Sequence, residues 1–229
     1  MVLTWVWRIL LALILLFLAW QVWIFAHVWW WQDHNPDTTA FMEIQRARLQ
    51  KDDPDADITH KWVPYERISP HLKRALIASE DAKFLDHDGF DWEGLQAAWE
   101  KNQKKGRITA GGSTISQQLA KNLFLSGKRS YLRKIEEAAI TVMLEHMLSK
   151  RRIFEIYLNV IEWGDGVFGA EAAARHYYKT SAARLSDAQA AKLAAMVPNP
   201  RYYDKARNDK RLLRKTAIIV RRMNYADVP

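Results

Sequence analysis

Residues 111–122 carry more hydrogen-bonding groups than a packed helix needs. The segment begins with two glycines, followed by Ser113 and Thr114 and then by further hydroxyl, amide and amine side chains. Either hydroxyl can cap a helix that runs to about Phe124, and the free N–H groups at a helix start attract anions. This composition favours a site that grips a polar, charged substrate. A capped amphipathic helix with a polar outer face is the alternative.

Helical spacing groups the polar side chains of this segment. Gln117, Lys121 and Phe124 fall on one face, and Gln118 and Asn122 fall on the neighbouring face. Three amides and one amine side by side offer both donors and acceptors to a ligand.

An acidic cluster precedes this segment and could supply proton-transfer chemistry. Glu80 ends an apolar helical pattern and is followed by Asp81 and by a turn that contains His87. A carboxylate at such a position suits a general base or acid, with Asp81 and His87 orienting the loop. The alternative is a pair of solvated charges beside a histidine that closes a turn.

A second cluster combines one carboxylate with two cations. Arg133 and Glu137 are four residues apart, so they share a face of the predicted helix, and Lys134 stands between them. Arginine offers phosphate oxygens a forked donor and lysine offers a point charge, so this cluster suits a phosphate group. A surface ion pair worth on the order of a few tenths of a kcal/mol is the alternative.

The rest of the sequence after the N-terminal region predicts a mainly α domain that positions these clusters. Ser69 with Pro70, Asp91, and Ser186 with Gln189 are typical helix starts. We expect further helices over about 130–148, 155–159, 171–178 and 209–223, and a linker at 52–57. No run of β alternation, internal repeat or low-complexity tract is present.

The N-terminus predicts a membrane anchor. Residues 9–31 contain no Asp, Glu, Lys or Arg, and a helix of that length covers about 34 Å, enough for a hydrocarbon core of about 30 Å. Arg8 favours a cytoplasmic N-terminus. We expect an anchor over 1–34 and a domain outside the cytoplasm over 35–229; a cleaved signal peptide is the alternative. Tryptophans that fit interfacial belts stand near both ends of the run: Trp5, Trp7, Trp29, Trp30 and Trp31.

Composition narrows the function classes. The sequence has no cysteine, which excludes disulfides and thiolate chemistry. Its formal charge of +8 predicts attraction to anionic lipid or phosphate, and the anchor argues against nucleic acid as the partner. The chain has no Ser-x-x-Lys of a penicillin-binding transpeptidase, no His-Glu-x-x-His zinc motif and no P-loop.

The clusters become specific when they are taken in order. Along the chain stand Glu80-Asp81-x-x-Phe84-x-x-His87-x-Gly89-x-Asp91, the segment 111–122, Arg133-Lys134-x-x-Glu137, and Ile156-Tyr157-Leu158-Asn159. Together they resemble the motifs of the family 51 glycosyltransferases, the peptidoglycan transglycosylases, over about residues 65–200. With one anchor and no second domain, the chain is most similar to the monofunctional biosynthetic form.

The resemblance implies a lysozyme-like helical fold and the polymerisation of lipid II. In that reaction a sugar 4-hydroxyl attacks the anomeric carbon of the growing strand, configuration inverts from α to β, and undecaprenyl pyrophosphate leaves. By position, Glu80 matches the family's general base, and Glu137 matches its second glutamate, which acts around the pyrophosphate. The positions that match its substrate-binding residues are Asp81, Ser113, Thr114, Gln118, Lys121, Asn122, Arg133 and Lys134.

The resemblance also implies partners and a location. The partners are lipid II, the growing glycan strand and inner-membrane lipid, with other cell-wall synthesis proteins as candidates; the catalytic domain is periplasmic. No cofactor is implied with certainty, and a divalent cation, Mg or Mn, on the pyrophosphate near Glu137 is left open. Trp92, Leu95 and Trp99 fit either a surface that dips into the bilayer or core packing.

Two other functions compete with polymerisation. A lytic, muramidase-like hydrolase on the same fold would use water and needs a paired acid and base or nucleophile. The cationic and amide groups argue against it, because a neutral glycan leaving group does not need them. A membrane-anchored scaffold without catalysis is the third alternative.

Overall fold

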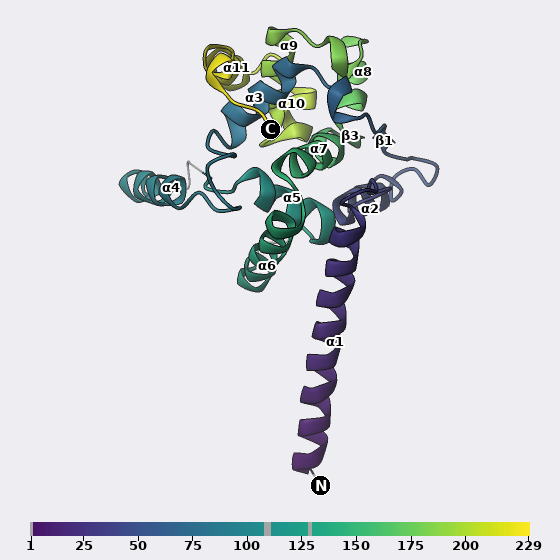
Figure 1. The fold of residues 1–229 in the computed structure, drawn as a ribbon. Coiled ribbons are helices and arrows are strands. Elements are labelled where there is room, and N and C mark those ends of the chain that lie inside the picture. The colour runs from purple at the N-terminus through teal and green to yellow at the C-terminus, as the bar shows by residue number, and fades with distance from the viewer. Residues whose placement is uncertain (1, 108–110, 128–129) are drawn as a thin grey trace.

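The computed structural model describes residues 2–107, 111–127 and 130–229, and it places a helical domain at one end of a long N-terminal helix, as Figure 1 shows. That helix, α1, spans Val2–Trp30. The expectation of a mainly α protein with one apolar N-terminal helix is confirmed. Within the described ranges, α1 is the one helix long and apolar enough to cross a membrane, over Thr4–Trp30.

The described part of the domain consists of ten further α-helices, three short 3₁₀ turns and three very short strands. The α-helices are α2 Ala40–Leu49, α3 Pro70–Glu80, α4 Trp92–Lys105, α5 Ile115–Phe124, α6 Tyr131–Met147, α7 Lys150–Val160, α8 Ala170–Tyr178, α9 Asp187–Met196, α10 Pro200–Lys205 and α11 Lys210–Arg222. The 3₁₀ turns are η1 Tyr65–Arg67, η2 Ala182–Arg184 and η3 Met223–Tyr225, and the strands are β1 Thr59–His60, β2 Glu162–Gly164 and β3 Val167–Phe168.

Side-chain caps start the helices where the sequence predicts them. Ser69 accepts the backbone N–H of His71 at 3.2 Å, with proline in the first turn of α3. Thr114 and Gln117 form a reciprocal capping box at α5. Ser186 and Gln189 form the same kind of box at α9, whereas Asp91 and Ser130 cap α4 and α6 with their side chains alone. The side chain of Gln117 is buried in the capping box at the start of α5, four residues before Lys121 on the same face of the helix.

Two helices and the small sheet are not predicted by the sequence pattern. The helices α2 and α10 are short, and α2 contains few buried side chains. The strand order is β1-β3-β2, with β3 parallel to β1 and antiparallel to β2. Strands of two or three residues are too short to show alternation.

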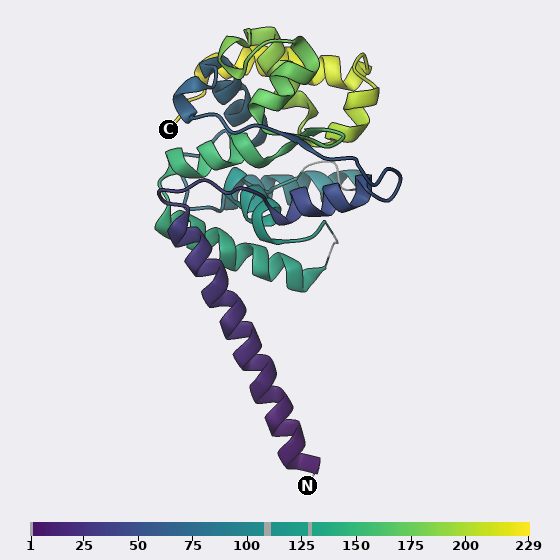
Figure 2. The ribbon, with the colours of Figure 1, turned by 90° about the vertical axis from the view of Figure 1, so that its right-hand side faces the viewer.

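The domain has an upper and a lower group of helices with α7 between them (Figure 2). In the upper group α9 packs against α3 and α11, and its fully buried alanines, Ala190, Ala191 and Ala194, let these helices approach closely. In the lower group α5 packs against α2, α6 and α7. Tyr157 and Trp163 are fully buried. The end of α3 and the length of α5 meet where the two groups join.

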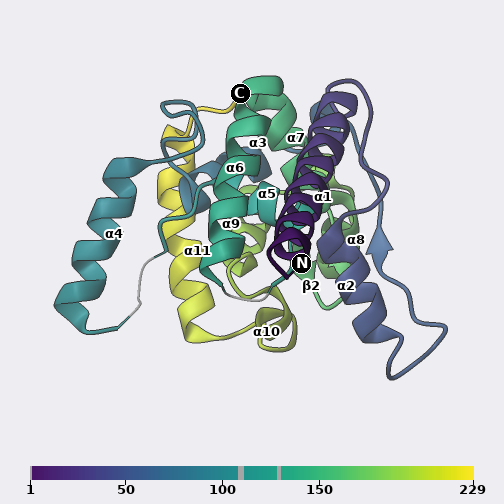
Figure 3. The same cartoon turned by 90° about the horizontal axis from the view of Figure 1, so that it is seen from below.

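The last turns of α1 are part of the domain. Ile24 and Val28 are fully buried, and the rings of Trp23 and Trp31 lie 5.8 Å and 5.3 Å from the ring of Phe124. Phe124, at the end of α5, therefore packs against the last turns of α1. Figure 3 shows α1 beside α6, with α4 standing apart.

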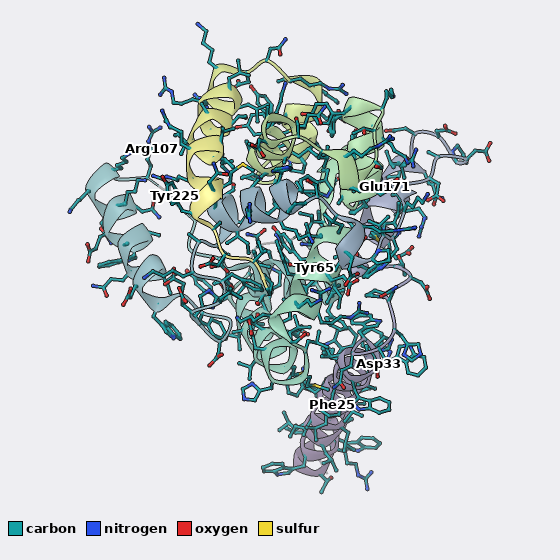
Figure 4. All side chains as sticks on the ribbon, turned by 45° about the horizontal axis from the view of Figure 1, so that its top comes forward. Phe25, Asp33, Tyr65, Arg107, Glu171 and Tyr225 are labelled. Carbon is teal, nitrogen blue, oxygen red and sulfur yellow. The ribbon has the colours of Figure 1, made fainter. Side chains whose placement is uncertain are left out.

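Hydrogen bonds also hold the end of α1 against the domain. Trp20 Nε1 donates to Glu136 Oε1 at 2.5 Å, and Arg152 Nε donates to the carbonyl of Trp31 at 2.8 Å. Figure 4 marks this end of α1 by Phe25 and Asp33. Residues 4–19 are exposed, so α1 has a free part and a docked part.

Candidate active site

Glu80 ends α3 and lies among three donors. Its side chain is 9% exposed. Oε1 accepts hydrogen bonds from Ser79 Oγ at 2.9 Å and from Lys215 Nζ at 3.3 Å, and Oε2 accepts one from Gln118 Nε2 at 3.2 Å. Donors from α3, α5 and α11 therefore converge on this carboxylate.

Asp81 joins the end of α3 to the start of α5. Its Oδ1 accepts from His87 Nε2 at 3.0 Å, and its Oδ2 accepts from the backbone N–H of Ile115 at 3.0 Å. A carboxylate at a helix N-terminus is stabilised by the free N–H groups and the dipole. Both oxygens are engaged, so Asp81 holds α5 and His87 in place beside Glu80.

A cavity of about 170 Å³ adjoins Glu80. Gly112, Ser113 and Thr114 line it from the start of α5. Gly112 permits a close approach to α4, because a Cβ there would lie 2.9 Å from Leu95 Cδ1. Thr114 Oγ1 donates to the carbonyl of Gly89 at 2.7 Å and accepts the N–H of Gln117, so this hydroxyl is occupied by the fold.

A second cavity, of about 290 Å³, lies farther along α5. Gln118, Lys121 and Asn122 line it on one side, and residues 197–201 line it on another. Asn122 Nδ2 donates to the carbonyl of Gln118 at 2.7 Å, which sets the side chain along the helix. Since Gln118 also bonds to Glu80, α5 connects the two cavities.

The predicted cation cluster lies on the first turns of α6. Glu137 is 3% exposed; Arg133 Nη1 donates to its Oε2 at 2.7 Å, and Lys134 Nζ donates to its Oε1. Lys134 Nζ also lies 3.5 Å from Ser113 Oγ, which brings the cluster to the cavity beside Glu80. Arg133 Nε is buried and makes no hydrogen bond to the part of the chain that the structure describes.

Lys121 shows that these groups share one electrostatic environment. Burial lowers the pKa of its amine; the carboxylates of Glu137 and Glu80 raise that pKa, and Arg133 and Lys134 lower it further. The side chain thus lies within reach of both predicted acidic groups. Glu80 is thus joined to α5 through Gln118, and the cation cluster approaches the same segment through the contact of Lys134 with Ser113.

A metal ion does not fit the acidic residues of this cleft. Among the residues that the structure describes, no three His, Cys, Asp or Glu side chains are grouped to hold a metal. Both oxygens of Glu137 are taken by Arg133 and Lys134, so the carboxylate has already been neutralised. We derive no step through a protein-bound cation.

Sequence reasoning missed Ser79, Tyr157 and Lys215. Tyr157 belongs to the motif 156–159, and its hydroxyl donates to Gln118 Oε1 at 3.0 Å. Lys215 comes from α11, which is rich in lysine and arginine. The sequence pattern did not predict where these positive charges would lie. Asn159 of the same motif bonds the backbone of Val63 in both directions, which is a structural role.

The apolar side chains of α4 face solvent. Trp92, Leu95 and Trp99 are 69%, 47% and 63% exposed, so core packing is the wrong alternative for them. On α6, Leu132 and Ile135 are exposed as well. A surface of this kind marks a contact with a membrane or a partner. The loop that follows α4 falls partly at 108–110, outside the described residues.

Comparisons with known proteins agree with this geometry. Residues 47–224 match the family model described as Transglycosylase. A protein of Laribacter hongkongensis, named biosynthetic peptidoglycan transglycosylase, is 69% identical over 227 residues, which are 99% of this chain and all of that protein. Proteins with the same name from Chromobacterium violaceum and Methylobacillus flagellatus are 67% and 66% identical over 97% of both chains.

Proposed function

Since this chain belongs to the transglycosylase family and is a peptidoglycan transglycosylase, we propose that it polymerises lipid II into β-1,4 glycan strands in the cleft between α3, α5 and α6. The helical domain has the family's lysozyme-like fold. The observation that carries the proposal is that both clusters reach the start of α5: Gln118 Nε2 donates to Glu80 Oε2 at 3.2 Å, and Lys134, which is paired with Glu137, lies 3.5 Å from Ser113 Oγ at the cavity beside Glu80.

Glu80 is the proposed general base. Its carboxylate takes the proton of the 4-hydroxyl of the incoming sugar as that oxygen attacks the anomeric carbon of the growing strand. The bond from this carbon to the diphosphate oxygen breaks, configuration inverts, and the electron pair leaves with undecaprenyl pyrophosphate. Positioned proton transfer of this kind contributes roughly 10²–10⁴-fold to a rate.

The cations of the cleft are proposed to stabilise the leaving group. Lys121, Arg133 and Lys134 supply three positive charges, and Glu137 holds two of them by ion pairs. The free Nε–H of Arg133 offers a donor for a phosphate oxygen. Charges fixed before the reaction stabilise developing charge without reorganisation. A divalent cation that took part would come bound to the diphosphate, because the carboxylate nearby is already paired.

The membrane placement follows from the apolar surfaces. We propose that α1 crosses the inner membrane once, with its N-terminus in the cytoplasm and the catalytic domain in the periplasm. Tryptophan and leucine side chains of α4 and the exposed face of α6 then meet the bilayer where the lipid-linked substrate enters. Other cell-wall synthesis proteins are proposed as partners through α1.

The hydrolytic alternative has little support in the cleft. A muramidase needs a second carboxylate that acts on water or on the sugar. Both carboxylate oxygens of Asp81 accept hydrogen bonds, from His87 and from the backbone of Ile115. Both oxygens of Glu137 form ion pairs with Arg133 and Lys134. Neither is free to serve beside Glu80.

Polymerisation of labelled lipid II by the full-length protein in detergent tests the proposal. We expect Glu80→Gln to lower the rate by about 10³-fold, since the amide cannot take the proton. Glu66→Gln is the matched control, because Glu66 is an exposed glutamate on η1. A wild-type rate in Glu80→Gln would show that the base is wrong, and shortened glycan in place of polymer would favour hydrolysis. A scaffold would show no polymerisation by either protein.

A further inference from the structure

Tyr157 lies beneath the cleft and does not reach it. The residue is fully buried in α7, and its hydroxyl donates to Gln118 Oε1 at 3.0 Å. Burial raises the pKa of this phenol well above its ordinary value, and the negative charges of Glu80 and Asp81 raise it further. The hydroxyl therefore stays protonated and remains a donor at every working pH.

A side-chain amide has two different ends, and its partners decide how it is oriented. Gln118 offers one carbonyl oxygen and one NH₂ group. A tyrosine that donates requires the oxygen on its side, which leaves the NH₂ group for Glu80 at 3.2 Å. The reverse orientation would place the amide oxygen against the carboxylate of Glu80, and two acceptors would then face one another.

We propose that Tyr157 is a positioning residue for the base: through the amide of Gln118 it keeps an N–H donor on Oε2 of Glu80. The inference rests on the proposed role of Glu80. Tyr157 contacts no substrate in this scheme, and its effect reaches the reaction through one intervening side chain.

Counting lone pairs shows which oxygen can take the proton. A carboxylate has about four acceptor sites, two on each oxygen. Oε1 of Glu80 accepts from Ser79 and from Lys215, and within the described ranges Oε2 accepts from Gln118 alone. The open site is on Oε2, so the amide that Tyr157 orients lies beside the lone pair that receives the proton.

Other charged groups also face Glu80, and the test must separate them from Tyr157. Asp81 follows it in the chain, Lys121 approaches from α5, and Lys215 approaches from α11. All three remain in place when the hydroxyl of Tyr157 is removed. A change in the pH profile of the reaction can then be assigned to the hydrogen-bond chain.

The test is the pH dependence of kcat/KM for lipid II polymerisation by wild type and Tyr157→Phe. Without the phenol, the amide of Gln118 loses the partner that fixes it, and Glu80 loses a steady donor to its charged form. The acid limb, which reports deprotonation of the base, should move to higher pH by about one unit. An acid limb at the wild-type position would overturn the proposal.

Two further variants separate positioning from general damage. Tyr177→Phe removes a hydroxyl that donates to the carbonyl of Trp163 at 2.9 Å, away from Glu80, and should leave the pH profile unchanged. Gln118→Met removes the amide itself and should shift the acid limb. Adding Tyr157→Phe to Gln118→Met should then produce no additional shift; an additional shift would show that Tyr157 acts by another route.

The same experiments separate this inference from the proposed function. If Glu80→Gln polymerises at the wild-type rate, the base assignment fails. If Glu80→Gln is inactive but Tyr157→Phe keeps the wild-type profile, the assignment stands and only the positioning role fails. Should Tyr157→Phe not fold, as judged by thermal unfolding in detergent, the Gln118→Met profile decides, and an unshifted acid limb there contradicts the proposal.

Discussion

Glu137 and Glu171 are two buried glutamates with similar partners and different consequences. They are 3% and 4% exposed, and each bonds an arginine four residues away on its own helix at 2.7 Å. The second oxygen of Glu171 accepts the backbone N–H of Ala182, also at 2.7 Å, and so ties α8 to η2. Figure 4 shows Glu171 on α8, away from α1.

The second oxygen of Glu137 accepts a further cation instead. Lys134 brings a positive charge in excess of the single carboxylate and extends to Ser113. Lys121 adds another charge nearby. The comparison teaches that an arginine–glutamate pair at helical spacing does not reveal its role. What distinguishes the two regions is whether positive charge remains after the carboxylate is paired.

Neutralising each glutamate is the strongest way to break this comparison. Glu137→Gln should lower polymerisation by about 10²–10³-fold, because two cations lose the group that holds them toward the leaving diphosphate. Glu171→Gln should keep the activity of the folded protein but lower the free energy of unfolding by about 1–3 kcal/mol. Rates with labelled lipid II and denaturant unfolding in detergent give the two quantities. Equal effects of both variants on activity would contradict the distinction.

Lys121→Met sharpens the comparison, because we expect it to lower the activity and to raise the stability. The variant should lose about 10²-fold in rate, because a charge on the diphosphate is missing. It should be more stable than wild type, by on the order of 1 kcal/mol, because burial disfavours the charged amine.

The pH dependence of that stabilisation checks its cause. The folded protein holds the Lys121 proton less tightly than the unfolded chain, so wild-type stability rises as pH rises through the lowered pKa. The advantage of Lys121→Met should therefore shrink as pH approaches the ordinary lysine value of about 10.4. A gap in unfolding free energy that widens with pH would contradict the assignment.

Exchanging the arginines for lysine gives the smallest effect. Arg133→Lys keeps the charge but removes the forked donor and the free Nε–H, so we expect about a tenfold loss in kcat/KM. Arg175→Lys, the counterpart on α8, has a side chain that is 60% exposed and should change neither activity nor stability by more than about 0.5 kcal/mol. A similar kinetic loss in both variants would contradict a role in catalysis that belongs to Arg133 and not to Arg175.

Local rules predicted most of the helices and failed where the structure depends on distant contacts. Ser69, Thr114, Ser130 and Ser186 cap helices because a hydroxyl can satisfy the free N–H groups of its own first turn. The helix α2 lies against α5, and β1 pairs with β3 although their paired residues, such as Thr59 and Val167, are about 100 positions apart. No local pattern records such contacts.

The candidate site also contains residues that local sequence predicted and residues that it did not. The order of four motifs identifies the family and places Glu80 and Glu137, but spacing cannot distinguish Arg133 from Arg175. Lys215 comes from a helix 135 positions away in the chain from Glu80, so its approach to that carboxylate could not be predicted from local sequence. The substrate-binding roles of residues 113–134 stay predictions.

In the proposed membrane placement, the docked end of α1 couples the domain to the thickness of the bilayer, because Ile24 and Val28 are buried in the domain core. Adding one residue to the exposed part of α1 would then raise the domain by about 1.5 Å and turn it by about 100° about the helix axis. A thicker or thinner bilayer would favour a different tilt of the whole protein. Lipid composition would then set the angle at which the cleft opens toward its substrate.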